Sequence, residues 1–248
     1  ARRKELHAQM DAYPVEVPAV GARIAVWLAN EPQGWTIPTL RALGVSDVNM
    51  DMTGGAAFST TFGVHGIRIA GGTGHSVQNN TVSLFGTMFG TATTSLLSSA
   101  LTIVGTGQTG MDVRNNVLSN TLAGGTTSIA HVSLFLPSGG TSAMNLNLNN
   151  NDYFSGTDAA RQGIAQVGTT AGTGFFLAPN FNPAATTPAS NLRSYTDTLR
   201  GTTGNDNASA IFDPSLVSTT DLHLSPGSLA QNAGATIAAV TNDIDQQL

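Results

Sequence analysis

The chain has 248 residues, of which only 10% are charged, and its formal net charge is -5 at pH 7. Ordinary globular domains carry roughly 25% charged residues, so hydroxyl and amide side chains must solvate much of this surface. The negative charge argues against a nucleic-acid partner. The lack of cysteine excludes disulfides and thiol chemistry. The sequence contains no run of about 18 apolar residues, so we expect no membrane span.

The first 45 residues differ in composition from the rest of the chain. Every Glu, the only Lys and both Trp lie within residues 1–35, whereas the chain after Arg41 is rich in Gly, Thr, Ser and Asn. We therefore expect residues 1–45 to form a non-repeat N-terminal cap and residues 46–248 to form one repeat domain. A remnant of another domain is the competing interpretation of residues 1–45.

From residue 66 onward, three kinds of short segment recur in a fixed order. A leading segment is followed by one that ends in paired asparagines, and then by a third apolar segment. Ile67, Leu101, Val132 and Ile164, taken as equivalent, place the leading segments 34, 31 and 32 residues apart. Alternating aliphatic residues predict strands, and the even period predicts stacking repeats. We therefore expect an all-β parallel β-helix with three strands per coil, since a β-sandwich does not predict such a regular cycle.

The paired asparagines follow Val77, Val113 and Leu148, which lie 36 and 35 residues apart. Asparagine tolerates the left-handed conformation that bends one strand into the next, and its amide can bond to the coils above and below. We expect two structural columns, which consist of Asn79, Asn115 and Asn150, and of Asn80, Asn116 and Asn151.

Two stretches resemble a known group of proteins. Residues 66–82, which read as one coil, and residues 221–234 together with 240–245 are similar to secreted bacterial right-handed parallel β-helix repeat proteins. These surface proteins belong to the broad pectate-lyase-like superfamily. The resemblance implies a right-handed β-helix and a secreted or cell-surface location. The family pattern continues Asp-Gly-x-x-Arg, from which residues 246–248 depart. Because the superfamily contains lyases, hydrolases, esterases, adhesins and spacers, the resemblance does not choose a function.

Few residues suggest catalysis. Asp112 and Arg114 alternate outward on one expected strand and, with His131, are candidates for a polysaccharide lyase or hydrolase. A surface ion pair is the simpler interpretation of the two charges. Ser76 lies in a sequence close to the nucleophile elbow G-x-S-x-G, but Gln78 replaces the last glycine. The histidines lack metal-ligand spacing, so we expect no metal and no cofactor.

Three aromatic residues are candidates for binding. Phe175, Phe176 and Phe181 lie in a long insertion, where they form an aromatic platform for sugar or anchor the insertion to the core. We expect a non-catalytic scaffold of adhesin type that binds glycan or another cell-surface polymer. The alternatives are a polysaccharide-active enzyme and an ester hydrolase that uses Ser76. Open coil ends also allow self-association.

Overall fold

A computed structural model describes residues 48–49, 58, 60, 63–89, 96–125, 129–182, 186–238 and 240. The expected cap, residues 1–45, and the last residues of the resemblance, 241–245, lie outside the described residues. Strands dominate the described part, which contains one α-helix and two short 3-10 helices. This composition agrees with the expected all-β class.

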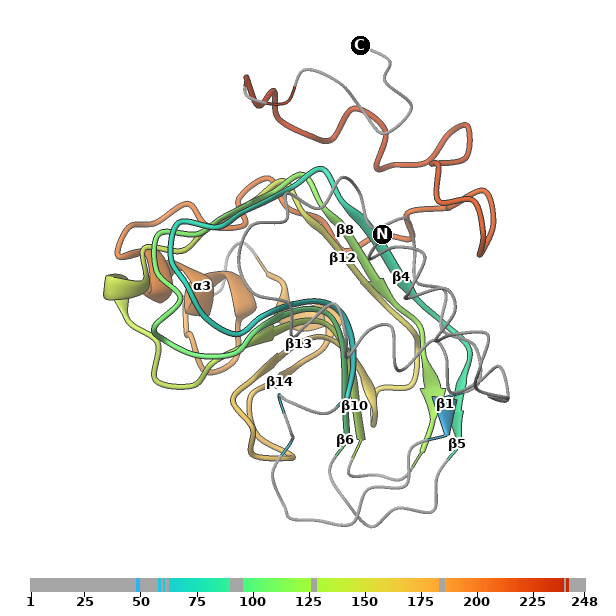
Figure 1. Ribbon diagram of the computed structural model, residues 1–248, viewed down its shortest axis with the longest axis horizontal. Coiled ribbons are helices and arrows are strands. Elements are labelled where there is room, and N and C mark those ends of the chain that lie inside the picture. Colours follow the sequence, from blue (N-terminus) through green and yellow to red (C-terminus); the bar gives the residue numbers. More distant parts are fainter. Residues whose placement is uncertain are drawn as a thin grey trace, which may run out of the picture.

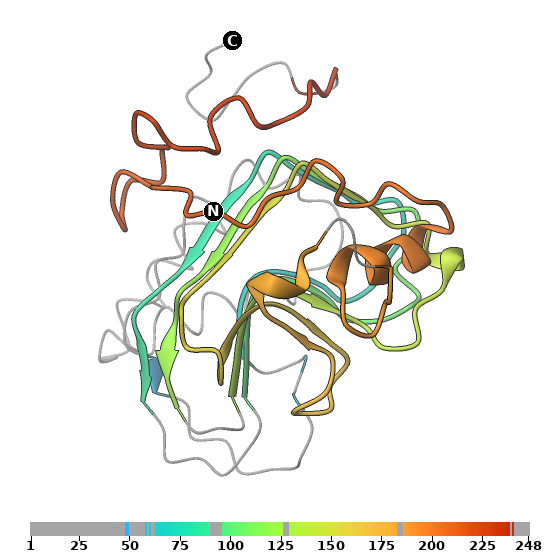
Figure 2. The same ribbon diagram turned by 180° about the vertical axis from the view of Figure 1, so that it is seen from behind.

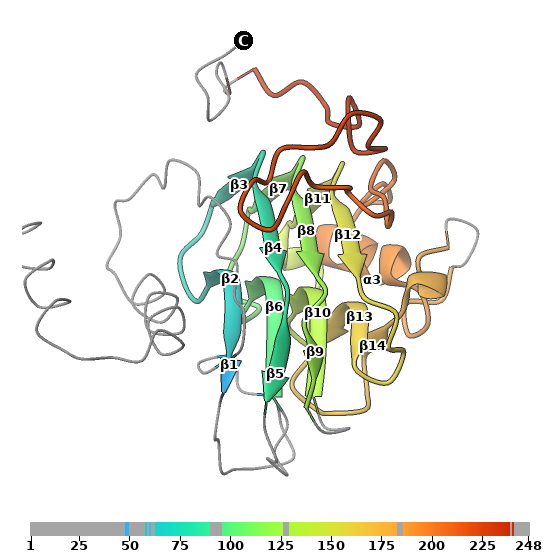
Figure 3. The ribbon, with the colours of Figure 1, turned by 90° about the vertical axis from the view of Figure 1, so that its right-hand side faces the viewer.

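The strands form four sheets. Sheet I contains β2 (Val64–Ile69), β6 (Leu96–Ile103), β10 (Ile129–Leu136), β13 (Gln162–Val167) and β14 (Phe175–Phe176). Sheet II contains β3 (Ser76–Gln78), β7 (Asp112–Arg114) and β11 (Asn147–Asn149). Sheet III contains β4 (Thr81–Leu84), β8 (Val117–Asn120) and β12 (Asp152–Ser155), which Figure 3 shows side by side. Sheet IV contains β1 (Val48–Asn49), β5 (Thr87–Phe89) and β9 (Ala123–Gly124). All neighbouring strands are parallel except β13 and β14.

The chain visits the sheets in a repeating order. In two circuits, which begin at β2 and β6, it passes from sheet I through sheets II, III and IV and returns to sheet I one strand further along. The circuit that begins at β10 passes through sheets II and III and returns from β12 directly to β13. Figure 1 looks along the stack of these circuits, so the strands of each sheet superpose. Val77 pairs with Val113, and Val113 pairs with Leu148, which confirms the equivalence expected from the asparagine-ended segments.

The register expected for sheet I was wrong after the second circuit. Ile67 pairs with Leu101 as expected, but Leu101 pairs with Leu134 rather than with Val132, and Leu134 pairs with Ala165 rather than with Ile164. Every residue of β6 and of β10 is buried. A strand with two apolar faces has no alternation of polar and apolar residues, so its sequence does not fix which residues share a face.

Two apolar clusters explain why both faces of sheet I are buried. The main cluster lies between the sheets and includes the fully buried side chains of Leu84, Leu101, Leu118, Leu134 and Tyr153. The second cluster packs on the other face of sheet I and consists of Phe58, Leu97, Ala130, Val132 and Phe135, with Ala171 and Phe175 against it. Val132 and Leu134 therefore belong to different clusters.

The last strands are covered by the segment that follows them. After η1 (Ser142–Met144) and η2 (Ala178–Asn180), α3 (Leu192–Arg200) packs on η1, and Figure 2 shows α3 over this end of the stack. The side chain of Asn191 caps α3 by accepting a hydrogen bond from the Ser194 N–H. Beyond α3, Ala210 forms a parallel bridge with Asp152, so the chain continues sheet III there.

Candidate functional site

Three asparagines turn the chain from sheet II into sheet III in successive circuits. Asn79, Asn115 and Asn150 have φ angles of 54°, 59° and 53°, within the left-handed region. Asparagine adopts this region more readily than most other residues because its short side chain bonds to the local backbone. The turns therefore place three paired asparagines at one corner of the stack.

The second asparagine of each pair forms an inner column of hydrogen-bonded amides. The amide oxygen of Asn116 accepts bonds from the backbone N–H and Nδ2 of Asn80, at 3.1 and 2.9 Å. The amide oxygen of Asn151 accepts the same two bonds from Asn116, also at 3.1 and 2.9 Å. The backbone N–H of Asn151 then donates to Ser209 Oγ at 3.0 Å. Side chains thus join each circuit to the next.

The first asparagine of each pair lies on the outside, and two of the three, Asn115 and Asn150, contact the C-terminal segment at Ala233 and Ala235. Nδ2 of Asn115 donates to the amide oxygen of Asn79 at 2.9 Å. The amide of Asn115 also donates to Ala235 O at 2.6 Å and accepts from the Ala235 N–H at 2.9 Å. Nδ2 of Asn150 donates to Ala233 O at 3.1 Å. The outer column therefore holds the C-terminal segment against the corner.

Asp112 and Arg114 form an ion pair on the outer face of sheet II. Nε and Nη2 of Arg114 donate to the two carboxylate oxygens of Asp112, at 2.6 and 2.5 Å. Gln78 and Asn147, from the circuits on either side, donate to the same carboxylate at 2.6 and 2.8 Å. The hydrogen bond from Arg114 is the main cause that holds the pKa of Asp112 below its usual value, and Asn147 and Gln78 lower it further. A carboxylate with this many donors is a weak base and is suited to binding or positioning.

His131 does not share a groove with this pair. It lies on β10 with no exposed surface, and burial is the main cause that lowers its pKa. Its Nε2 lies 3.2 Å from Gly124 O, so that nitrogen carries hydrogen, and Nδ1 accepts from Ser98 Oγ–H at 2.8 Å. The buried ring is therefore part of the interior hydrogen bonding of sheet I.

Ser76 is exposed on β3, and it pairs in register with Asp112. The neighbouring His75 ring donates from Nε2 to Gly71 O at 2.8 Å rather than to the serine. The segment around Ser76 also runs along a parallel strand instead of entering a helix. The geometry that activates the serine of a nucleophile elbow is therefore not formed here.

The three candidate phenylalanines pack against the protein at different places. Phe176 is buried in the main cluster, and Phe175 packs against the second cluster. The ring of Phe181 meets Tyr153 edge to face, with 6.1 Å between centroids, and Arg193 lies 5.6 Å from the Phe181 centroid. The arrangement is that of anchors for the insertion.

No group of three or more His, Asp or Glu side chains in the described ranges is placed to hold a metal ion.

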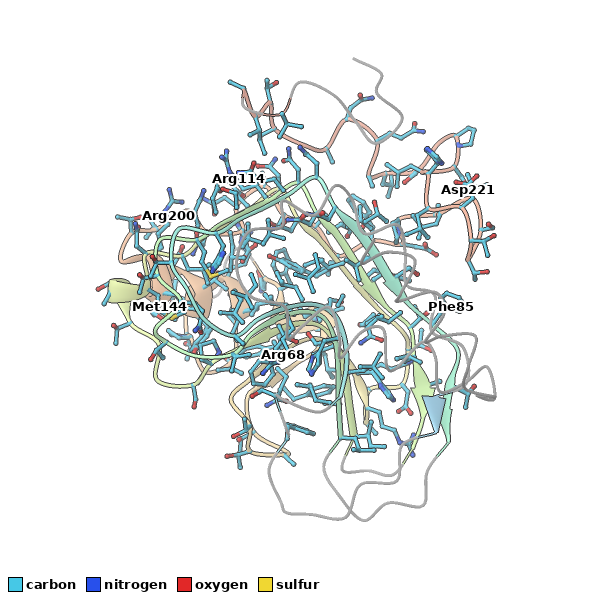
Figure 4. All side chains as sticks on the ribbon, viewed as in Figure 1. Arg68, Phe85, Arg114, Met144, Arg200 and Asp221 are labelled. Carbon is cyan, nitrogen blue, oxygen red and sulfur yellow. The ribbon has the colours of Figure 1, made fainter. Side chains whose placement is uncertain are left out.

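His65 is buried in sheet I, where its Nδ1 forms a hydrogen bond with Thr102 Oγ1 at 2.8 Å. Burial, together with the charge of Arg68, lowers the pKa of His65 to about 4. Figure 4 shows Arg68 beside sheet I, away from Arg114.

Within the part of the chain that the structure describes, no helix is both long enough and apolar enough to span a bilayer.

A pocket of about 50 Å³ lies where the asparagine corner meets the C-terminal segment, and sequence reasoning missed it. One carboxylate, Asp152, lines it and is 5% exposed. Oδ1 of Asp152 accepts the Phe212 N–H at 3.1 Å, whereas buried Oδ2 has no protein partner. Burial raises the pKa of Asp152 to about 7, against the effect of the Phe212 N–H, and the charge of Asp213 adds to the rise.

A second buried carboxylate, Asp206, was also missed. Tyr153 Oη and Ser209 Oγ donate to its Oδ1 at 2.7 and 2.8 Å, and Thr196 Oγ1 donates to Oδ2 at 2.9 Å. Burial raises the pKa of Asp206 to about 6 although all three donors lower it. Because Tyr153 Oη also accepts from Asn151 Nδ2 at 3.2 Å, this network continues the inner column.

Comparison of the chain with protein-family models, with curated proteins and with solved structures gives no significant match.

Proposed function

We propose that the circuits form a right-handed parallel β-helix and that the chain is a non-catalytic scaffold of adhesin type. It would be secreted or attached to a bacterial cell surface and would bind glycan or another surface polymer. The repeated return of the chain to each parallel sheet supports the β-helix. Connections between parallel strands of one sheet are right-handed in about 98% of cases, which supports the handedness.

The outer face of sheet II carries the proposal for binding. Its outward side chains form two columns in register, which are Ser76, Asp112 and Asn147, and Gln78, Arg114 and Asn149. Neighbouring members of a column are about 4.8 Å apart, the spacing of adjacent strands. Hydroxyl, amide, carboxylate and guanidinium groups offer both donors and acceptors at this spacing. Such a regular polar face suits the repeated hydroxyl groups of a polysaccharide.

Affinity electrophoresis in gels that contain different polysaccharides tests this proposal. We expect at least one polysaccharide to retard the chain, and we expect the double variant Ser76→Ala with Asn147→Ala to lose most of the retardation. Thr198→Ala, on the exposed side of α3, is the matched control and should migrate as the parent chain does. Retardation that the double variant retains in full would contradict binding through sheet II.

Turnover assays on the same polysaccharides and on short-chain esters test the non-catalytic part. We expect no product from the parent chain. Product that is lost in Asp112→Ala or in Ser76→Ala would show catalysis and overturn this part of the proposal.

A polysaccharide-active enzyme is the alternative, and one observation favours it. The pKa of Asp152, about 7, lies in the range of a general acid that works near neutral pH. In that case, turnover by the parent chain would be lost in Asp152→Asn and would fall as the pH rises above 7. No contact of Ser76 favours the ester-hydrolase alternative.

Self-association remains part of the proposal, and the fold indicates which end would take part. Ala210 bridges the outer edge of β12, and β14 pairs with β13, so the last circuit is partly covered. In the part of the chain that the structure describes, no strand pairs with the other edges of β3 and β4. Sedimentation velocity over a hundredfold range of concentration would detect association through those edges.

A further inference from the structure

The pocket at the asparagine corner contains an acceptor that the protein does not use. The residues that line it include Asn116, Asn150, Asn151, Asp152, Phe212 and Ala233. Asp152 is the one titratable side chain among them. Because its Oδ2 is buried without a protein partner, the oxygen lacks the hydrogen bond that a buried polar atom normally has.

The other polar groups of the pocket limit what the missing partner can be. The amide oxygens of Asn116 and Asn151 each already accept two hydrogen bonds from the inner column. Nδ2 of Asn150 donates to Ala233 O, which leaves the amide oxygen of Asn150 as a second acceptor for a ligand. Oδ2 of Asp152 and the amide oxygen of Asn150 are therefore two acceptors that a hydrogen-bond donor in the pocket would satisfy.

The charge and the walls of the pocket favour an organic cation over a metal ion. Asp213, which follows Phe212, adds a second negative charge near Asp152, and no positively charged side chain lines the pocket. Calcium takes six to eight oxygen ligands, whereas most of the wall here is alanine, glycine, valine and phenylalanine. A volume of about 50 Å³ accommodates roughly three or four atoms of water size.

We propose that this pocket binds a small primary alkylammonium ion, with Asp152 as its counter-ion and the small apolar side chains around its alkyl group. One ammonium hydrogen is donated to Asp152 Oδ2, and another is donated to the amide oxygen of Asn150. The site lies at the corner of sheets II and III and is independent of the glycan surface proposed for sheet II. Its ligand would bind between the stack and the C-terminal segment.

Isothermal titration calorimetry of the full chain with propylammonium chloride at pH 8 tests the proposal. Trimethylpropylammonium chloride has the same charge but no N–H donor, and we expect it to bind at least 10-fold more weakly. Asp152→Asn should weaken propylammonium binding at least 10-fold, because a charge-assisted hydrogen bond is lost. Asp158→Asn, which removes a partly exposed carboxylate that pairs with Arg161 elsewhere, should bind as the parent chain does.

A second variant and a second pH distinguish a lost binding site from a misfolded variant when binding is weakened. Ala233→Leu fills the pocket without changing Asp152, and it should also abolish binding. Binding to the parent chain should strengthen from pH 6 to pH 8 as Asp152 ionises, and the charge of the neighbouring Asp213 favours the same cation. Absence of binding at pH 8 would mean that water alone satisfies Oδ2 and would overturn the proposal. Equal binding of the trimethylated ion, or full binding by either Asp152→Asn or Ala233→Leu, would also overturn it.

Discussion

Replacement of Asn116 by alanine should destabilise the fold far more than the same replacement at Asn80. The Asn116 side chain makes five hydrogen bonds, to Asn80, Val77, Arg114 and Asn151, and the residue is 1% exposed. Each bond contributes about 1 kcal/mol net, and a buried group left without a partner costs about 1–3 kcal/mol. Three of the bonds share the two hydrogens of Nδ2, so we expect a loss of about 3–5 kcal/mol in the free energy of unfolding.

Asn80 is the matched control because it stands at the end of the same column. Its side chain makes two bonds, to Gln78 O and to the Asn116 amide oxygen, and its backbone N–H keeps its acceptor when the side chain is removed. We expect Asn80→Ala to lose about 1 kcal/mol.

Urea denaturation followed by circular dichroism would measure both changes, provided that the slope against urea concentration is the same for all chains. Similar losses for the two variants would refute the view that the inner column stabilises the stack by satisfying buried groups. A loss below about 1 kcal/mol for Asn116→Ala would refute it as well.

Further predictions concern buried titratable groups and the outer ion pair. Folded His65 has a pKa of about 4, whereas the same side chain in the unfolded chain binds a proton below about pH 6.5. The free energy of unfolding should therefore fall by up to about 3 kcal/mol as the pH falls from 6.5 to 4. His65→Gln should remove this decline in urea titrations at stepped pH, and an unchanged slope would contradict the assignment. Asp206 acts in the opposite direction, because its pKa of about 6 in the folded chain lies above the ordinary value of 3.8. Its contribution to the free energy of unfolding is therefore present at low pH and is lost as the pH rises from about 4 to 6. Asp206→Asn should abolish that loss. Tyr153→Phe removes a buried donor to Asp206 and should lower the free energy of unfolding by about 2 kcal/mol, whereas a change below about 0.5 kcal/mol would show that the bond is unimportant. Asp112→Asn breaks a partly exposed ion pair and should change stability in the same assay by less than about 1 kcal/mol, so a larger loss would indicate a structural role.

The sequence predicted the stacking of sheets II and III because one apolar residue and two asparagines recur there in each circuit. Val77, Val113 and Leu148 fixed the pairing, and the left-handed turns at the asparagines match the conformation that this residue tolerates. Sheet I lacked such a marker. Its strands are buried on both faces, so Val132 was as plausible an inward residue as Leu134.

The buried carboxylates could not be found by repeat analysis because they depart from the repeat. Asp152 occupies the position of Thr81 and Val117 in the earlier circuits, and that change from Val117 to a carboxylate was the available signal. The burial of Asp152 depends on the segment around Phe212, about 60 residues later, which no local pattern predicts. Asp206 likewise becomes buried only when α3 and the segment after it close over Tyr153.

The inner column also has a direction. Asn80 donates to Asn116, Asn116 donates to Asn151, and the Nδ2 of Asn151 points to Tyr153 Oη, which donates to Asp206. The amide dipoles therefore add along the stack, with their positive ends toward the carboxylate of Asp206 and the amide oxygen of Asn80 at the negative end. A symmetric pair that placed the two Asn80 amides face to face would set acceptor against acceptor. Any assembly that extends the column must be head to tail, and such an interface forms open filaments unless its rotation closes into a ring.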